Sequence, residues 1–140
     1  CRALLDDLDN LKLRKEMQIA SMLAGMAISQ TRTAIAHSIS YPLTYTYNVP
    51  HGLASSFTLE AITLKLKEEK VLDKEEQKIL DEVVNLLQRF PLKKMIKKYL
   101  NLTQATDLVS EMYHPERMKN FLLKLTELEL KQILISSFNG

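Results

Sequence analysis

The strongest constraint on the fold of this chain is the uneven placement of its charged residues. Residues 1–16 carry eight formal charges and residues 60–140 carry twenty-seven, whereas Arg32 carries the only one in residues 17–59. Because an unpaired charge is rarely buried, a long stretch without charges is the part of a chain that a fold hides. Residues 17–29 are apolar or small on nearly all sides, which predicts a helix packed all round. We therefore expect this helix to be the buried centre of the fold.

The rest of the chain has the pattern of amphipathic helices separated by turns. Asp73 and Glu76 form a capping-box pair that predicts a helix start. Thr126 and Glu129 form a second pair, and Pro91 suits the first turn of another helix. Hairpin signals are missing and strand-like alternation is nearly absent, so we predict an all-α fold, a helical bundle around the buried helix.

Length and composition restrict the class of protein. With 140 residues, 46% of them apolar, the chain can bury a core of its own, so we predict a single all-helical domain over residues 1–140. The one cysteine, Cys1, excludes an internal disulfide framework and fits a reducing compartment. The sequence has no signal-peptide pattern and no apolar run of about 18 residues. We expect a cytoplasmic protein without a membrane contact, and the net charge of +2 gives no reason to expect a nucleic-acid partner.

Two of the three histidines lie in a stretch that prolines interrupt. His37 and His51 are fourteen residues apart, with Pro42 and Pro50 between them. One straight helix would hold the two imidazoles about 21 Å apart, at about 1.5 Å per residue. Because Pro42 disfavours a continuous helix and Pro50 suits the start of a new one, we expect a helix, an extended turn and a second helix, which can bring both rings together. Imidazole is a common metal ligand; the alternative is two helix-end histidines satisfied by hydrogen bonds.

Three further groups of residues have both a functional and a structural interpretation. Tyr41, Tyr45 and Tyr47 either line a substrate pocket or pack in the core near the proline turn. The lysine cluster at residues 93–98 forms the solvated side of an amphipathic helix, or a face that binds phosphate or membrane. His114, next to a proline in a polar turn, is expected at the surface.

The segment from residue 17 to about residue 62 resembles the iron-containing (group III) alcohol dehydrogenase family. In that family, a buried helix rich in Ala and Gly leads into a His, a Pro-Leu pair and a Pro-His-Gly-Leu-Ala sequence. The corresponding residues here are Ala20, Ala24, Gly25, Ala27, His37, Pro42-Leu43 and Pro50-His51-Gly52-Leu53-Ala54. Residues 114–120 and 125–127 are similar to the C-terminal end of the family.

The resemblance implies a two-domain enzyme. An N-terminal domain binds NAD or NADP, a helical C-terminal domain follows, and a divalent metal, iron or zinc, lies in the cleft between them. The family holds this metal with an Asp, a His four residues later and two later histidines, which His37 and His51 match. No Asp lies four residues before any histidine of this chain. We therefore expect the C-terminal part of such an enzyme without its N-terminal domain, inactive by itself and self-associating through uncovered apolar surface.

The implied activity is that of an NAD(P)-dependent, metal-dependent alcohol dehydrogenase or aldehyde reductase acting on a small alcohol or aldehyde. The metal would polarise the carbonyl or alkoxide during hydride transfer. Tyr41 stands where many members have a second His, and its Ser-Tyr-Pro-Leu-Thr context is similar to a subgroup acting on phosphonoacetaldehyde-like substrates. We expect Tyr41 to act as a proton donor. Arg32 is expected to bind an anionic group of the substrate, or else to pair with a carboxylate of the later helices.

Two hypotheses from other classes remain open. The chain can be a non-catalytic helical interaction module in which the histidines are incidental. It can also be a basic-helix module that binds nucleic acid or anionic lipid through Lys93 to Lys98. Bound metal that is lost when His37 or His51 is substituted would distinguish the enzyme from the interaction module. Binding to nucleic acid or anionic lipid that weakens steeply with salt would identify the basic-helix module.

Overall fold

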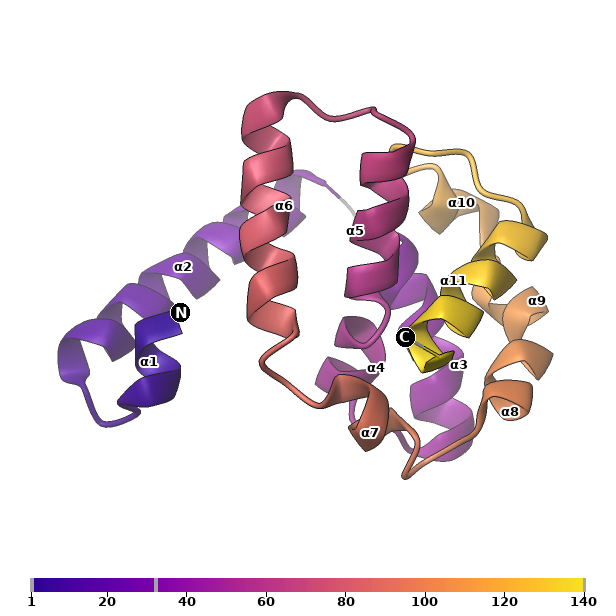
Figure 1. Cartoon of the computed structure of the whole chain (residues 1–140), viewed down its shortest axis with the longest axis horizontal. Helices are drawn as coiled ribbons and strands as arrows, with labels where there is room; N and C mark the ends of the chain where they lie inside the picture. Colours follow the sequence, from indigo (N-terminus) through magenta and orange to yellow (C-terminus); the bar gives the residue numbers. More distant parts are fainter. Residues whose placement is uncertain (1, 32, 140) are drawn as a thin grey trace. The chain divides into compact units, whose positions relative to one another are not determined.

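The computed structural model describes residues 2–31 and 33–139, which form helices, turns and loops without a strand (Figure 1). The all-α prediction is therefore confirmed. In chain order the helices are α1 (Arg2–Asp6), α2 (Leu11–Gln30), α3 (Ile35–Tyr47), α4 (His51–Ser56), α5 (Leu59–Glu68), α6 (Lys74–Leu87), α7 (Leu92–Ile96), α8 (Leu102–Asp107), α9 (Val109–Met112), α10 (Pro115–Met118) and α11 (Glu127–Asn139). One compact unit contains α1 and α2, and the other contains α3 to α11.

Helix α2 begins at Leu11, before the expected start at residue 17, because a capping residue precedes it. Asn10 caps it, because the side-chain oxygen of Asn10 accepts a hydrogen bond from the backbone N–H of Leu13 at 3.2 Å. This bond satisfies one of the backbone donors left open at the start of a helix. The helix continues to Gln30 and so includes the whole uncharged segment at residues 17–29.

The expectation that this segment is the buried centre of the fold is wrong for the residues that the structure describes. None of the residues of α2 is buried, and Met26 is 59% exposed. Ile19, Leu23 and Met26 are spaced by four and three residues, so they form one exposed apolar face. The lack of charges shows which residues avoid water, but it does not show which part of a protein covers them. Although residues 17–29 of α2 are uncharged, no described helix is long and apolar enough to cross a membrane.

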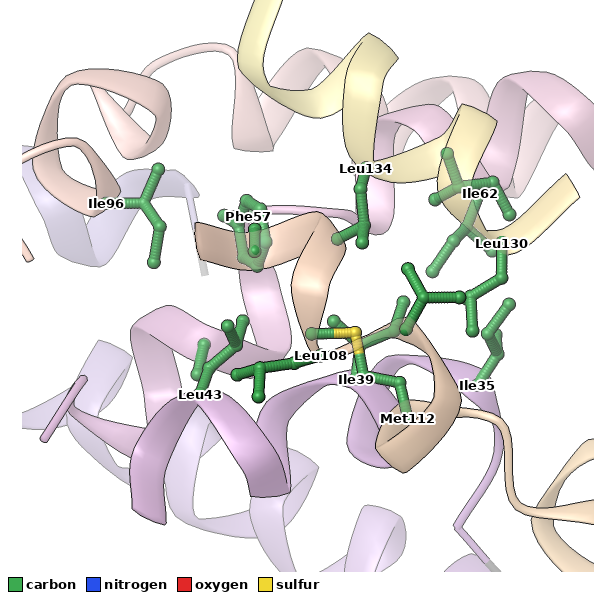
Figure 2. Close-up of a cluster of buried hydrophobic side chains, with 14 of the residues drawn as sticks. Ile35, Ile39, Leu43, Phe57, Ile62, Ile96, Leu108, Met112, Leu130 and Leu134 are labelled. Atoms are coloured by element: carbon green, nitrogen blue, oxygen red, sulfur yellow. The ribbon is translucent and has the colours of Figure 1, made fainter. Parts of the chain in front are cut away.

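The core of the second unit is built around α3 and α11. Ile39 and Leu43 of α3 and Leu130 and Leu134 of α11 are completely buried, and they belong to one cluster with Met112 of α9 (Figure 2). Helix α3 contacts α4, α9 and α10, while α11 contacts α5, α8 and α9. Burying one such aliphatic side chain stabilises a fold by about 1.5–3 kcal/mol. The cluster therefore holds α3 firmly among the later helices.

Both predicted capping boxes are present. Asp73 accepts hydrogen bonds from the backbone N–H groups of Glu75 and Glu76, and Glu76 in turn accepts one from the backbone N–H of Asp73 at 2.9 Å. The carboxylate of Glu129 accepts bonds from the backbone N–H and the hydroxyl of Thr126 at 2.8 and 2.9 Å. These bonds start α6 and α11 at the positions that the sequence predicts. Helices α5 and α6 then lie side by side (Figure 1).

Pro42 does not end its helix, which corrects the expected break there. Helix α3 runs Ile35–Tyr47 with Pro42 inside it. An internal proline costs a helix about 3 kcal/mol, but burial of Ile39 and Leu43 on either side outweighs this cost. The chain turns instead at Asn48, which has a left-handed φ of 52° and donates its N–H to the carbonyl of Leu43. Asn is one of the few residues that adopt this conformation readily at a helix end.

Candidate metal centre

His37 and His51 lie close together in the second unit. His37 is in the first turn of α3 and His51 is the first residue of α4. The segment at residues 48–50 turns the chain back so that α4 packs against α3. The centres of the two imidazole rings are 5.4 Å apart, and the rings are tilted by 57°. The prediction that a reversal brings both rings to one place is confirmed, although Asn48 and not Pro42 makes the turn.

The separation of the two rings suits a shared metal ion. An imidazole nitrogen binds zinc at about 2.0–2.1 Å and tetrahedral ligands subtend about 109°, so two ligating rings have centres about 5 Å apart. Among the described residues, neither His37 nor His51 has a hydrogen-bond partner for its side chain. The interpretation in which hydrogen bonds satisfy both histidines therefore has no support from this part of the chain. Both rings can offer a nitrogen to a ligand.

The surroundings of His37 favour its neutral form. Burial lowers the pKa of His37 below its ordinary value of 6.5, and repulsion from His51 lowers it further. Both effects penalise the charged imidazolium. At neutral pH His37 is therefore mostly uncharged, which is the form that binds a metal.

The two histidines supply only part of a ligand set. Within residues 2–31 and 33–139, no group of three or more His, Cys, Asp or Glu side chains is arranged to hold a metal ion. Structural zinc has four protein ligands and catalytic zinc has three. His37 and His51 thus fit a metal whose further donors do not come from the described residues.

Tyr41 lies beside the histidine pair, and Arg117 contacts Tyr41. Tyr41 follows His37 by one turn of α3, and its ring centre is 6.3 Å from that of His37 and 5.7 Å from that of His51. Tyr41 is 41% exposed, so it lies at the edge of the second unit and not in its core. Arg117, from α10, places its Cζ atom 4.5 Å from the centre of the Tyr41 ring, a cation–π contact. Sequence reasoning missed Arg117, because only the packing of α10 on α3 brings it to Tyr41.

The other candidate residues do not join this cluster. Arg32 lies outside the described residues. Tyr45 is exposed and Tyr47 packs partly buried against the core, so the three tyrosines do not line one pocket. Lys93 pairs with Glu60 at 3.6 Å, and the other three lysines of the 93–98 cluster are exposed. Only the first two of these four lysines belong to α7, so they do not form one long basic helix.

Comparisons with known proteins identify one family and several similar enzymes. The family described as "Fe-containing alcohol dehydrogenase family, C-terminal" matches residues 1–131. A 1-propanol dehydrogenase of Citrobacter freundii is 29% identical over 130 residues, which cover 93% of this chain and 29% of that protein. A 1,3-propanediol dehydrogenase of the same organism is 40% identical over 50 residues, 36% of this chain and 13% of that protein. A sulfoacetaldehyde reductase of Bilophila wadsworthia is 44% identical over 48 residues, 34% of this chain and 12% of that protein.

The chain matches at most 29% of the length of these relatives. No solved structure matches it significantly.

Proposed function

Because the chain belongs to the iron-containing alcohol dehydrogenase family, we propose that it is the metal-binding helical part of an NAD(P)-dependent alcohol dehydrogenase or aldehyde reductase. The observation that carries this proposal is the pairing of His37 and His51 at 5.4 Å. The nucleotide would bind mainly to an N-terminal domain outside these residues, as the family resemblance implies. The three relatives are named for 1-propanol, 1,3-propanediol and sulfoacetaldehyde, so we propose a short alcohol or aldehyde as the substrate.

The residues of the site have separate tasks in this proposal. When bound, a divalent metal supplies Lewis-acid polarisation of the substrate oxygen. His37 and His51 provide two imidazole donors, which suit iron(II) and zinc and do not select between them. The lowered pKa of His37 keeps a lone pair ready at neutral pH. The packing of α3 on α4 brings the two histidines together without a ligand.

Tyr41 is the proton donor in this proposal. Its ring lies beside both imidazoles, and it is exposed at the edge of the second unit. A phenol donates a proton at neutral pH and is a poor base. We therefore assign it the delivery of a proton to an alkoxide formed by aldehyde reduction.

The test is the metal content of the full-length protein that contains this chain. We expect purified wild-type protein to hold stoichiometric metal by plasma mass spectrometry, and His37→Ala and His51→Ala to lose it. His114→Ala is the matched control, because His114 is an exposed histidine outside the ring cluster. Circular dichroism of each variant checks that the fold is retained. Metal that survives both substitutions would contradict the proposal and favour a helical interaction module with incidental histidines.

A further inference from the structure

Arg117 presents a positive charge against the ring of Tyr41 that no described carboxylate neutralises. Its Cζ atom lies 4.5 Å from the centre of the Tyr41 ring. Within the part of the chain that the structure describes, no ion pair joins Arg117 to an Asp or Glu. The adjacent Glu116 instead forms an ion pair with Lys119 at 2.6 Å. A guanidinium held in this way is disposed to bind an anion from outside the chain.

Short helix α10 fixes where Arg117 lies. Met118, the next residue, is buried, and the backbone N–H of Arg117 donates to the carbonyl of His114 at 3.0 Å. Helix α10 packs on α3, the helix that carries Tyr41. Stacking on an aromatic face leaves the N–H edge of a guanidinium free for two parallel hydrogen bonds to an oxyanion. Arg117 is therefore partly oriented before a ligand binds.

The Tyr41 ring connects Arg117 to the candidate metal centre. That ring is 5.7 Å from the His51 ring and 6.3 Å from the His37 ring, so the guanidinium and both imidazoles are neighbours of the same aromatic ring. A short molecule whose reacting oxygen lies at the imidazoles could place its other end at Arg117, on the far side of its contact with the Tyr41 ring or beside it. Only a negatively charged group would gain charge-assisted hydrogen bonds there, whereas a neutral group would leave the guanidinium to water.

We propose that Arg117 determines substrate specificity by binding the sulfonate, phosphonate or carboxylate of a short aldehyde or alcohol whose reacting carbon lies beside His37 and His51. This inference rests on the proposed function above and adds the class of substrate. Arg117 takes no part in proton or hydride transfer. It lowers the free energy of the complex with an acidic substrate and does little for a neutral one.

The test compares an acidic with a neutral substrate in the full-length protein. The ratio of kcat/KM for sulfoacetaldehyde to kcat/KM for propanal is measured in the wild type, Arg117→Met, Arg117→Lys and Lys119→Met. We expect Arg117→Met to lower this ratio about 10- to 100-fold, the usual effect of losing a hydrogen bond to a charged group. Arg117→Lys should be intermediate, because it keeps the charge and loses the planar fork. Lys119→Met removes an exposed cation two residues away and should change the ratio less than about twofold.

A second measurement does not depend on catalysis. Isothermal titration with 2-hydroxyethanesulfonate should show binding to the wild type. Binding to Arg117→Met should be at least about tenfold weaker, because the variant loses a hydrogen bond to a charged group. An unchanged kcat/KM ratio or unchanged sulfonate binding in Arg117→Met overturns the inference. A raised nucleotide KM with equal losses for both aldehydes also overturns it, because Arg117 would then hold a phosphate of the nucleotide. Failure of the proposed function gives a different result. The metal content of the protein would then be unchanged by substitution of His37 or His51, while Arg117 could still control sulfonate binding.

Discussion

Shortening Leu43 to alanine tests whether α3 is the central support of the second unit. Leu43 is completely buried, and its carbonyl accepts the N–H of Asn48 at the turn that leads to His51. The substitution removes three carbons, a loss of about 2.4 kcal/mol at about 0.8 kcal/mol per buried methylene. A residual cavity of about 80 Å³ adds about 2 kcal/mol at about 24 cal/mol per Å³. We therefore expect the free energy of unfolding to fall by about 4 kcal/mol.

The assay is equilibrium unfolding in urea, in which the midpoint and the slope m give the free energy of unfolding. Leu128→Ala is the matched control, because Leu128 is 67% exposed on α11 and should cost less than about 1 kcal/mol. The two variants delete the same atoms, so their difference measures burial alone. If Leu43→Ala lowers the free energy of unfolding by less than about 1 kcal/mol while the slope m is unchanged, the assignment of α3 to the core is refuted.

Two further predictions concern Tyr41 and Glu129. Tyr41→Phe in the full-length enzyme should lower kcat for aldehyde reduction while the unfolding midpoint changes little, because Tyr41 lies at an exposed edge; a large stability loss with kcat unchanged would assign the hydroxyl to packing. Hydrogen bonds from Thr126, and then Lys65, lower the pKa of Glu129, so its stabilising effect is present above the ordinary glutamate pKa and is lost as the pH falls through the lowered value. In urea unfolding, Glu129→Gln should therefore be less stable than the wild type at pH 7, and the difference in the free energy of unfolding should shrink below about pH 4. A difference that does not change with pH would contradict this linkage.

Features that depend on near neighbours in the chain could be predicted well. The capping boxes at Asp73 and Thr126 form as expected, because each joins groups three residues apart. The all-α class follows from the same local signals. The approach of His37 to His51 was also predictable in outline, since the residues between them cannot form one straight helix through to His51.

Details of that approach were less accessible from the sequence. Pro42 was expected to break the helix, but burial on both sides of it keeps α3 continuous. The turn lies at Asn48, whose left-handed backbone is a recognisable signal of a helix end. The sequence analysis identified Pro42 and not Asn48, and only the structure shows that the chain turns at Asn48.

The sequence by itself determined where α6 and α11 start, which stretch avoids water and that two histidines could meet, because propensity, capping and charge patterning act over a few residues. Only the tertiary structure decided that α3 is buried in the core of the second unit while no residue of α2 is buried. It also decided that Arg117 contacts the ring of Tyr41. Both outcomes depend on which surfaces pack together over long separations in the chain. The hydrophobic effect is non-directional, and burial against any apolar surface is favourable. An uncharged stretch such as residues 17–29 therefore indicates apolar surface that avoids water, but it does not specify which surface packs against it.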